Sequence, residues 1–208
     1  MAFFPKRISP LKTLVGAAAL TLALSAQAVR YQGQDFPDTL ELGGKTLVLS
    51  GIGERAAYGF HGYSAALYMT KVGRTPDEIY AVPGPKRLEL RITLSIKSID
   101  AAEFEKAIDK GVGRNCSEAE KAALGDRVQR LNANLHLVGS VKKGDVVLIE
   151  YLPERGTTLT VNGKVYGQPV PGGDLYTAFL KVFLGEKVSD ERLRAGLLGQ
   201  TTYKGAPV

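Results

Sequence analysis

The sequence contains little of the chemistry from which most catalytic and metal sites are built. Among its 208 residues are one cysteine, two histidines and no tryptophan. A single cysteine excludes an intramolecular disulfide and a thiolate metal cluster, so we interpret Cys116 as a buried, unreactive thiol rather than half of a bond between two chains. His61 and His136 fall on unrelated segments, which argues against a three-ligand zinc site.

Common catalytic and cofactor motifs are also missing. No predicted strand is followed by G-x-G-x-x-G, and the sequence has no P-loop, no H-E-x-x-H and no G-x-S-x-G. Asp109 and Asp126 fall on different predicted helices, so nothing pairs them as an acid and a base. The motifs therefore predict no cofactor and no bound metal, and they name no reaction.

The N-terminus has the order of a secretory signal peptide. Three basic residues and no acidic one accompany an uncharged run from Leu14 to Leu24, and Ser25-Ala-Gln-Ala28 then supplies a small-residue cleavage site. The apolar run is shorter than the roughly 20 residues of a membrane-spanning helix, and no cysteine follows for a lipid anchor. We predict a signal peptide at residues 1–28 and a periplasmic or secreted protein with no stable membrane anchor after cleavage. An uncleaved anchor is the alternative.

One domain is predicted at residues 29–208, which is long enough for a hydrophobic core. Without the three cations of the leader, 24 basic residues face 21 acidic ones, and the basic residues are scattered rather than clustered. We therefore predict no nucleic-acid partner. Protein partners and the oligomeric state stay open.

Hydrophobic periodicity alternates between 2 and 3.6 residues along this domain. Period 2, with tight turns at Gly43-Gly44 and Asn162-Gly163, predicts strands over residues 40–42, 45–49, 62–71, 86–96, 146–152, 157–161 and 164–166. Helical spacing and capping residues predict helices over residues 76–82, 100–112, 117–137, 173–183 and 189–198. Residues 31–38 are polar and broken by proline, and we expect an irregular lead-in there. The grouping predicts an α+β fold, an antiparallel sheet with helices packed on one face.

Five stretches together resemble the chalcone isomerase fold, in its bacterial chalcone isomerase-like branch. A hairpin from Leu40 ends in Gly51-Ile-Gly-Glu-Arg55, which is similar to the G-x-G-x-R turn of the family, and Tyr63 to Met69 is similar to its small-residue strand. The other three stretches are residues 83–90, residues 142–146 with Asn162-Gly163, and residues 175–185. They cover nearly all of the predicted domain, and the resemblance implies an open-faced β-sandwich.

The resemblance also implies a site whose polar residues this chain has largely replaced. In the plant enzymes, an arginine in the G-x-G-x-R turn binds and polarises the flavanone-type substrate, and Arg55 matches it. The family's threonine corresponds to Tyr63, its tyrosine to Phe104, and its polar residue of the closing helix to Val182. Its asparagine corresponds to Gly111, or to Asn115 if one helical turn is inserted. Because one position of five is kept, the resemblance implies a member that is not a chalcone isomerase.

Apolar residues at catalytic positions suit the tail of an amphipathic ligand better than they suit catalysis. We predict that Arg55 binds the head group of a fatty acid or similar small ligand, with Tyr63, Phe104 and Val182 lining the tail. Non-catalytic relatives of this fold bind fatty acids, which agrees in kind. An isomerase or lyase is the first rival, and it requires Arg55 and a hydroxyl to converge in a closed polar pocket. A protein-interaction module is the second, and it requires that no cavity lies near Arg55.

Two further residues on predicted strands have more than one interpretation. Tyr68 belongs either to the core, which we favour, or to the cleft together with Tyr63. Arg91 lies on the polar side of its strand, where it is either solvated, which we favour, or a second partner for a carboxylate.

Overall fold

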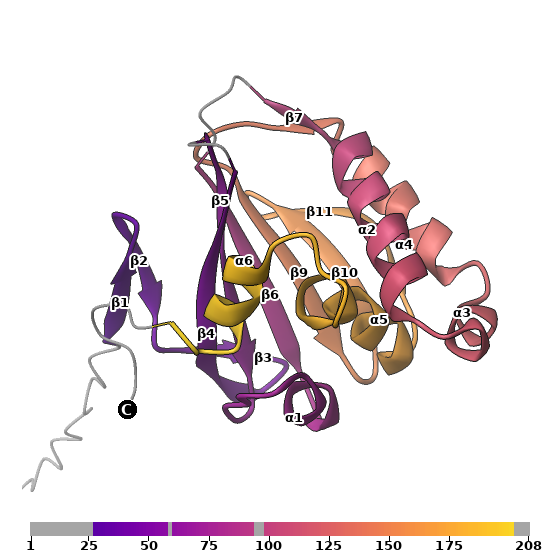
Figure 1. Ribbon diagram of the computed structural model, residues 1–208, viewed down its shortest axis with the longest axis horizontal. Coiled ribbons are helices and arrows are strands. Elements are labelled where there is room, and N and C mark those ends of the chain that lie inside the picture. The colour runs from indigo at the N-terminus through magenta and orange to yellow at the C-terminus, as the bar shows by residue number, and fades with distance from the viewer. Residues whose placement is uncertain (1–26, 58–59, 94–97, 202–208) are drawn as a thin grey trace, which may run out of the picture.

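A seven-stranded antiparallel sheet organises the chain in the computed structural model, which describes residues 27–57, 60–93 and 98–201 (Figure 1). The strand order is β11-β10-β9-β6-β5-β4-β3. The bounds are β3 (Thr39–Leu42), β4 (Lys45–Ala57), β5 (Phe60–Met69), β6 (Lys86–Ile92), β9 (Val146–Leu152), β10 (Gly156–Val161) and β11 (Lys164–Val170). The sheet confirms the predicted α+β class. Residues 1–26 of the predicted signal peptide lie outside the described residues.

Side chains of the inner strand β5 divide between the two faces of the sheet. Tyr63, Ala65, Leu67 and Met69 join the larger core, whereas Ala66 and Tyr68 join a second, smaller cluster. This is the period-2 alternation expected of a strand buried on both sides. The predicted Asn162-Gly163 turn is confirmed, with φ of 51° and 81°. The strand predicted at residues 86–96 ends at Ile92, and residues 94–97 lie outside the described part.

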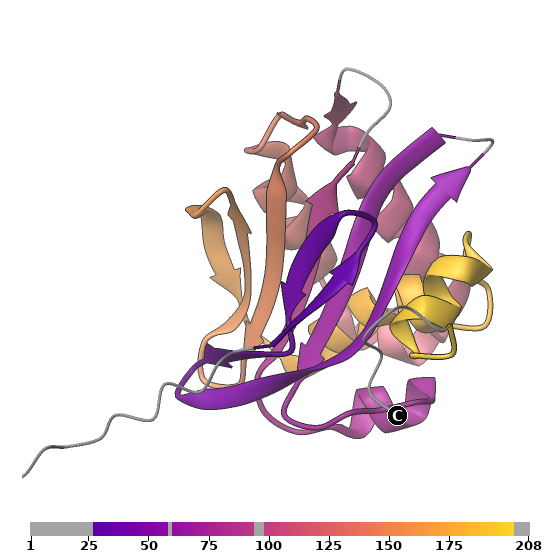
Figure 2. The ribbon, with the colours of Figure 1, turned by 90° about the vertical axis from the view of Figure 1, so that its left-hand side faces the viewer.

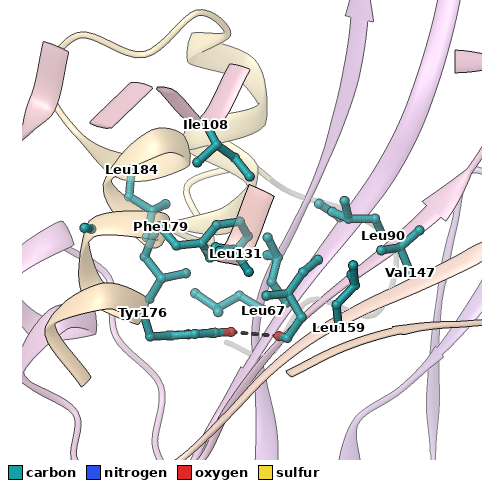
Figure 3. Close-up of a cluster of buried hydrophobic side chains, with 14 of the residues drawn as sticks. Leu67, Leu90, Ile108, Leu131, Val147, Leu159, Tyr176, Phe179 and Leu184 are labelled. Atoms are coloured by element: carbon teal, nitrogen blue, oxygen red, sulfur yellow. Dashed lines mark hydrogen bonds between the residues drawn. The ribbon is translucent and has the colours of Figure 1, made fainter. Parts of the chain in front are cut away.

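Helices cover one face of this sheet, as predicted (Figure 1). They are α1 (Pro76–Ala81), α2 (Ala101–Asn115), α3 (Glu118–Leu124), α4 (Arg127–His136), α5 (Gly173–Leu184) and α6 (Glu191–Leu197). Between helices and sheet lies the larger core, in which the Tyr176 hydroxyl donates to the Ile149 carbonyl at 3.0 Å (Figure 3). Capping boxes at Thr75 and Ser117 start α1 and α3. None of the described helices has the length and hydrophobicity needed to span a membrane.

The single helix predicted over residues 117–137 is wrong, because the chain forms two helices there. Gly125 ends α3 with a φ of 56°, a conformation that side-chain-bearing residues rarely adopt. The guanidinium of Arg127 then donates to the carbonyls of Ala123 and Leu124, which satisfies main-chain acceptors at the end of α3. The apolar stripe of Leu124, Val128, Leu131 and Leu135 is nevertheless buried as one surface.

The predicted irregular lead-in is also wrong, because its residues form a hairpin on the other face of the sheet. Strands β1 (Ala28–Tyr31) and β2 (Gln34–Pro37) pair through a turn at Gln32-Gly33, both with positive φ. Val29 and Phe36 are buried in the smaller cluster with residues of β4 and β5. Figure 2 shows this hairpin in front of the sheet, with the helices behind it. A second small pairing joins β7 (Ile99–Asp100) to β8 (Ser140–Val141).

Candidate ligand-binding site

A cavity of about 340 Å³ lies inside the larger core, between the sheet and the helices. Strands β4, β5, β6, β9 and β10 supply its floor, and α2, α4 and α5 supply much of its roof. Six of its wall residues appear in Figure 3: Leu90, Ile108, Leu131, Val147, Leu159 and Phe179. The volume lies near the lower end of the roughly 300–1,000 Å³ typical of ligand pockets, so a small molecule would fill it.

All four predicted binding residues lie on the wall of this one cavity. Arg55 and Tyr63 are direct cross-strand partners on β4 and β5. Phe104 is on α2, with its ring centroid 6.4 Å from that of Tyr63, and Val182 is on α5. Residues that are up to 127 positions apart in the sequence, from Arg55 to Val182, are thus brought to one place by the packing of α2 and α5 on the sheet.

Arg55 contacts the segment that joins α5 to α6. Its Nη1 donates to Ser189 Oγ at 3.2 Å. Asp190, the next residue, accepts from the backbone N–H groups of Arg192 and Leu193 at 3.1 and 3.0 Å and so caps α6. Arg55, Ser189 and Asp190 all line the cavity, and they form a polar group at one end of it.

Further hydrogen bonds fix both ends of the segment formed by residues 186–190. At the α2 side, Asn115 accepts from the Lys187 N–H at 2.8 Å and donates to the Lys187 carbonyl at 3.4 Å. At the β4 side, Arg192 Nη2 donates to the Ala56 carbonyl at 2.6 Å. Asn115, one of two alternatives for the family asparagine, therefore contacts this segment and does not appear on the cavity wall.

Two glycines of the Gly51-Ile-Gly-Glu-Arg55 motif explain why α6 lies so close to β4. A Cβ on Gly53 would come within 2.5 Å of the Leu193 carbonyl oxygen, and one on Gly51 would overlap the carbonyl of Leu197. Because neither glycine carries a side chain, the backbone of α6 rests directly on the strand. The motif thereby positions Ser189 and Asp190, at the start of α6, beside Arg55.

Burial controls the protonation of Tyr63. Removal from water raises the pKa of Tyr63 to about 12, an effect that the positive charge of Arg55 opposes and the negative charge of Asp190 reinforces. The phenol is thus neutral at ordinary pH and remains a hydrogen-bond donor. It stands beside the guanidinium, where a ligand oxygen would accept from both groups.

Polar side chains are few on the wall formed by the described residues. They are Arg55, Tyr63, Glu103, Ser189 and Asp190, and every other lining residue is apolar or glycine. Phe104 and Val182 offer no group that could transfer a proton. No set of three His, Cys, Asp or Glu side chains among the described residues is arranged to hold a metal ion. The arrangement is suited to binding an amphipathic molecule by its head group.

Several other residues considered from the sequence lie away from the cavity. Tyr68 is fully buried in the smaller cluster under the β1–β2 hairpin, which confirms it as a core residue. Arg91 is on that same face, 2.7 Å from Glu89 and stacked 4.1 Å from the centroid of the Phe36 ring, so the expectation of a solvated side chain is wrong. The β1–β2 hairpin covers much of the side chain, which remains 24% exposed. Cys116 is a free, buried thiol, as interpreted, and its pKa is raised by burial.

Gly111 and the two histidines have different surroundings. Gly111 packs against Val182, which leaves no room for a side chain at that position. His136 is exposed, with Nδ1 3.4 Å from a carboxylate oxygen of Glu105. His61 belongs to β5. His136 is not among the wall residues.

Sequence reasoning missed Ser189 and Asp190 as members of the site. Ser189 was predicted to begin the last helix, whereas α6 begins at Glu191 with Asp190 as its cap. The pattern Ser-Asp-Glu before an apolar stripe is a helix-start signal that could have been read more closely. Their place beside Arg55 follows from the contact between α6 and β4, which no local pattern encodes.

Comparisons with known proteins agree with this architecture. A family model described as chalcone isomerase-like matches residues 28–199. A comparison with curated proteins finds no match. The fold is similar to the crystal structure of a fatty-acid binding protein from Arabidopsis thaliana, with a TM-score of 0.59, 13% sequence identity, and coverage of 83% of this chain and 96% of that chain. At this identity the likeness is one of fold.

Proposed function

The chain belongs to the chalcone isomerase-like family, and within it we propose a non-catalytic protein that binds a fatty acid or similar small amphipathic ligand beside Arg55. One observation carries the proposal: among the described residues, a cavity places the Arg55 guanidinium and the Tyr63 phenol, beside Ser189 and Asp190, on a wall that is otherwise almost wholly apolar. A polar head and an apolar tail are the two parts of a ligand that would satisfy both regions.

Arg55 and Tyr63 would hold the head group. A guanidinium presents several N–H donors in a fixed plane, and charge-assisted hydrogen bonds to a carboxylate are the stronger kind. One Arg55 donor already meets Ser189, a neutral acceptor that an anionic oxygen would replace with a gain. The Tyr63 hydroxyl, kept protonated by its raised pKa, would donate a second hydrogen bond.

The tail of the ligand would lie against residues that occupy positions of the catalytic site in the plant enzymes. Phe104 and Val182 present only hydrocarbon to the cavity. Burial of apolar ligand surface on such a wall contributes roughly 25 cal/mol per Å² before the costs of binding are subtracted. The Arabidopsis protein of similar fold is described as fatty-acid binding, which supports the same class of ligand for this chain.

An isomerase or lyase of the chalcone isomerase type is the second candidate. It is supported by the cross-strand pairing of Arg55 with Tyr63, because a phenol and a cation are the groups that polarise an enone. The apolar character of positions 104, 111 and 182 speaks against it. Turnover of a chalcone that is abolished in Arg55→Ala would favour this candidate over binding alone.

Titration of delipidated protein with lauric acid tests the proposed function. We expect saturable binding, with an affinity reduced about 10- to 150-fold in Arg55→Ala, since a hydrogen bond to a charged group contributes about 1.5–3 kcal/mol. Arg130→Ala, at an exposed arginine of α4 that is absent from the cavity wall, is the matched control and should bind like the parent. Equal binding by Arg55→Ala, or no binding by the parent, would contradict the proposal.

We further propose that the protein acts outside the cytoplasm after loss of residues 1–28. Cleavage after Ala28 would leave Val29 to Tyr31 paired with β2 in the N-terminal hairpin. The intact mass of protein recovered from the periplasm or medium should correspond to a chain that starts at Val29. A mass that retains the leader would contradict this.

A further inference from the structure

Among the described residues, all but one of the polar side chains on the cavity wall are gathered at one end, and from this we infer that the ligand carries a single polar group. The ligand is an unsubstituted chain with one head group, and its tail crosses the sheet from β4 toward β10. The inference rests on the proposed function and narrows its ligand class, because it excludes molecules that are polar at both ends. Dicarboxylic acids, ω-hydroxy acids and polyphenols are such molecules.

The direction of the tail follows from the order of the strands. Arg55, Tyr63, Leu90, Val147 and Val161 line the cavity from β4, β5, β6, β9 and β10, which are successive neighbours in the sheet. Four inter-strand steps of about 4.8 Å give a span of about 19 Å from the first strand to the last. The floor is therefore an elongated track across the strands, with Arg55 at one end.

All but one of the polar wall residues stand at the Arg55 end. Ser189 is hydrogen-bonded to Arg55, Asp190 follows it in sequence, and Tyr63 is the cross-strand partner of Arg55. The exception is Glu103 on α2, whose side chain is 61% exposed and forms an ion pair with Lys106 at 2.8 Å. A carboxylate so exposed faces water rather than the buried end of the track.

The described residues that line the cavity at the β10 end carry only hydrocarbon side chains. Leu131 and Leu135 of α4 lie over Leu159 and Val161 of β10, and all four are at most 8% exposed. The main-chain groups of β10 are paired with β9 and β11 on either side. A second polar group on a ligand would find no partner among these lining side chains, and an unpaired buried polar group is costly.

Binding of three molecules of equal chain length tests this inference. The full-length protein, delipidated, is titrated calorimetrically with lauric acid, its ω-hydroxy derivative and the corresponding α,ω-dicarboxylic acid. We expect lauric acid to bind, the ω-hydroxy acid to bind about 5- to 150-fold more weakly, and the diacid to show no measurable binding, because burial of an unpaired hydroxyl or carboxylate carries these penalties.

A substitution at the far end supplies the positive control. Val161→Thr adds a hydroxyl of nearly unchanged shape where the tail is expected to end, so the preference for lauric acid over its ω-hydroxy derivative should shrink. Val165→Thr, at a residue of β11 that is 55% exposed, is the matched change away from the cavity and should leave the preference as it is. If Val161→Thr fails to fold, the parent's preference among the three ligands decides alone.

The outcomes separate the inference from the function on which it rests. Equal binding of lauric acid and its ω-hydroxy derivative by the parent would overturn the inference and leave the proposed function standing. An unchanged preference in folded Val161→Thr would overturn the placement of the tail at β10. Absence of lauric acid binding, with or without binding of the other two, would overturn the proposed function itself.

Discussion

Two buried tyrosines differ in what their hydroxyls meet. Tyr176 donates to the Ile149 carbonyl at 3.0 Å, whereas the Tyr68 hydroxyl has no hydrogen-bond partner among the described residues. Both phenols are almost wholly removed from water, at 1% and 0% exposure. Removing the paired hydroxyl should therefore lower stability, whereas removing the unpaired one should not.

Urea unfolding of Tyr68→Phe and Tyr176→Phe measures this difference. We expect Tyr176→Phe to lower the free energy of unfolding by about 0.5–1.5 kcal/mol, the net contribution of one hydrogen bond. Tyr68→Phe should leave it unchanged or raise it by up to about 1 kcal/mol, because the folded state no longer buries an unsatisfied hydroxyl. Equal losses in the two variants would mean that the Tyr68 hydroxyl is paired in solution.

At the scale of elements, the contact of α6 with β4 holds the polar end of the cavity together. Gly53→Ala would press a methyl group against the Leu193 carbonyl and force α6 outward. We expect a loss of about 1–3 kcal/mol of stability, as for other overpacked sites, and weaker lauric acid binding, because Ser189 and Asp190 move with the helix. Thermal unfolding and calorimetric titration measure the two effects.

Gly113→Ala provides the contrast within the same protein. This glycine is exposed on α2, its φ is not positive, and a Cβ there would meet nothing within 4 Å. Alanine should stabilise the helix by about 0.5–1 kcal/mol and leave ligand binding unchanged. If Gly53→Ala behaved like Gly113→Ala, the glycines of the motif would not be the reason for the close approach of α6.

The elements that sequence reasoning found are those whose pattern is local. Strict alternation marked β6, and Pro76 at a first helical position and the capping box at Ser117 marked helix starts, so the class of fold followed from them. The hairpin at residues 28–37 was missed because Pro37 was taken as a break, although a proline ends the edge strand without costing a ladder bond. Gly125 was passed over because one glycine is tolerated inside many helices.

The candidate site was predictable to a similar extent. Arg55, Tyr63, Phe104 and Val182 were proposed from family resemblance, and the structure places all four on one wall. The polarity of the whole wall was not predictable, because it depends on how α4 and the segment before α6 pack against the sheet. Arg91 was misjudged for the same reason, since its covering hairpin is a tertiary contact rather than a property of β6.

For the molecule as a whole, buried phenols predict a sharp limit to stability at alkaline pH. Burial raises the pKa of Tyr63 to about 12, and it raises the pKa of Tyr68, Tyr80 and Tyr176 as well. Tyrosines of the unfolded chain ionise near pH 10, so between that pH and the folded pKa values the unfolded state releases protons that the folded state retains. The stabilisation is fully present below about pH 10 and is lost as the pH rises through the folded pKa values.

The free energy of unfolding should therefore be flat up to about pH 9 and fall steeply above about pH 10. Each of these tyrosines contributes a slope of up to about 1.4 kcal/mol per pH unit. Urea titrations across this pH range measure the slope of the free energy of unfolding against pH. In Tyr68→Phe this slope should be smaller by the contribution of one tyrosine. A slope unaffected by Tyr68→Phe would show that this phenol ionises as readily in the folded chain as in the unfolded one.

The contact between Gly111 and Val182 constrains how this cavity could have evolved. A Cβ at position 111 would lie 2.6 Å from Val182 Cγ1, so the asparagine that the related enzymes carry cannot enter at Gly111 while valine occupies position 182. Shrinking Val182 first would open a void in the wall and cost stability. The two positions are thus epistatic, and a lineage passing between an apolar and a polar wall must change both nearly together or cross a less stable intermediate.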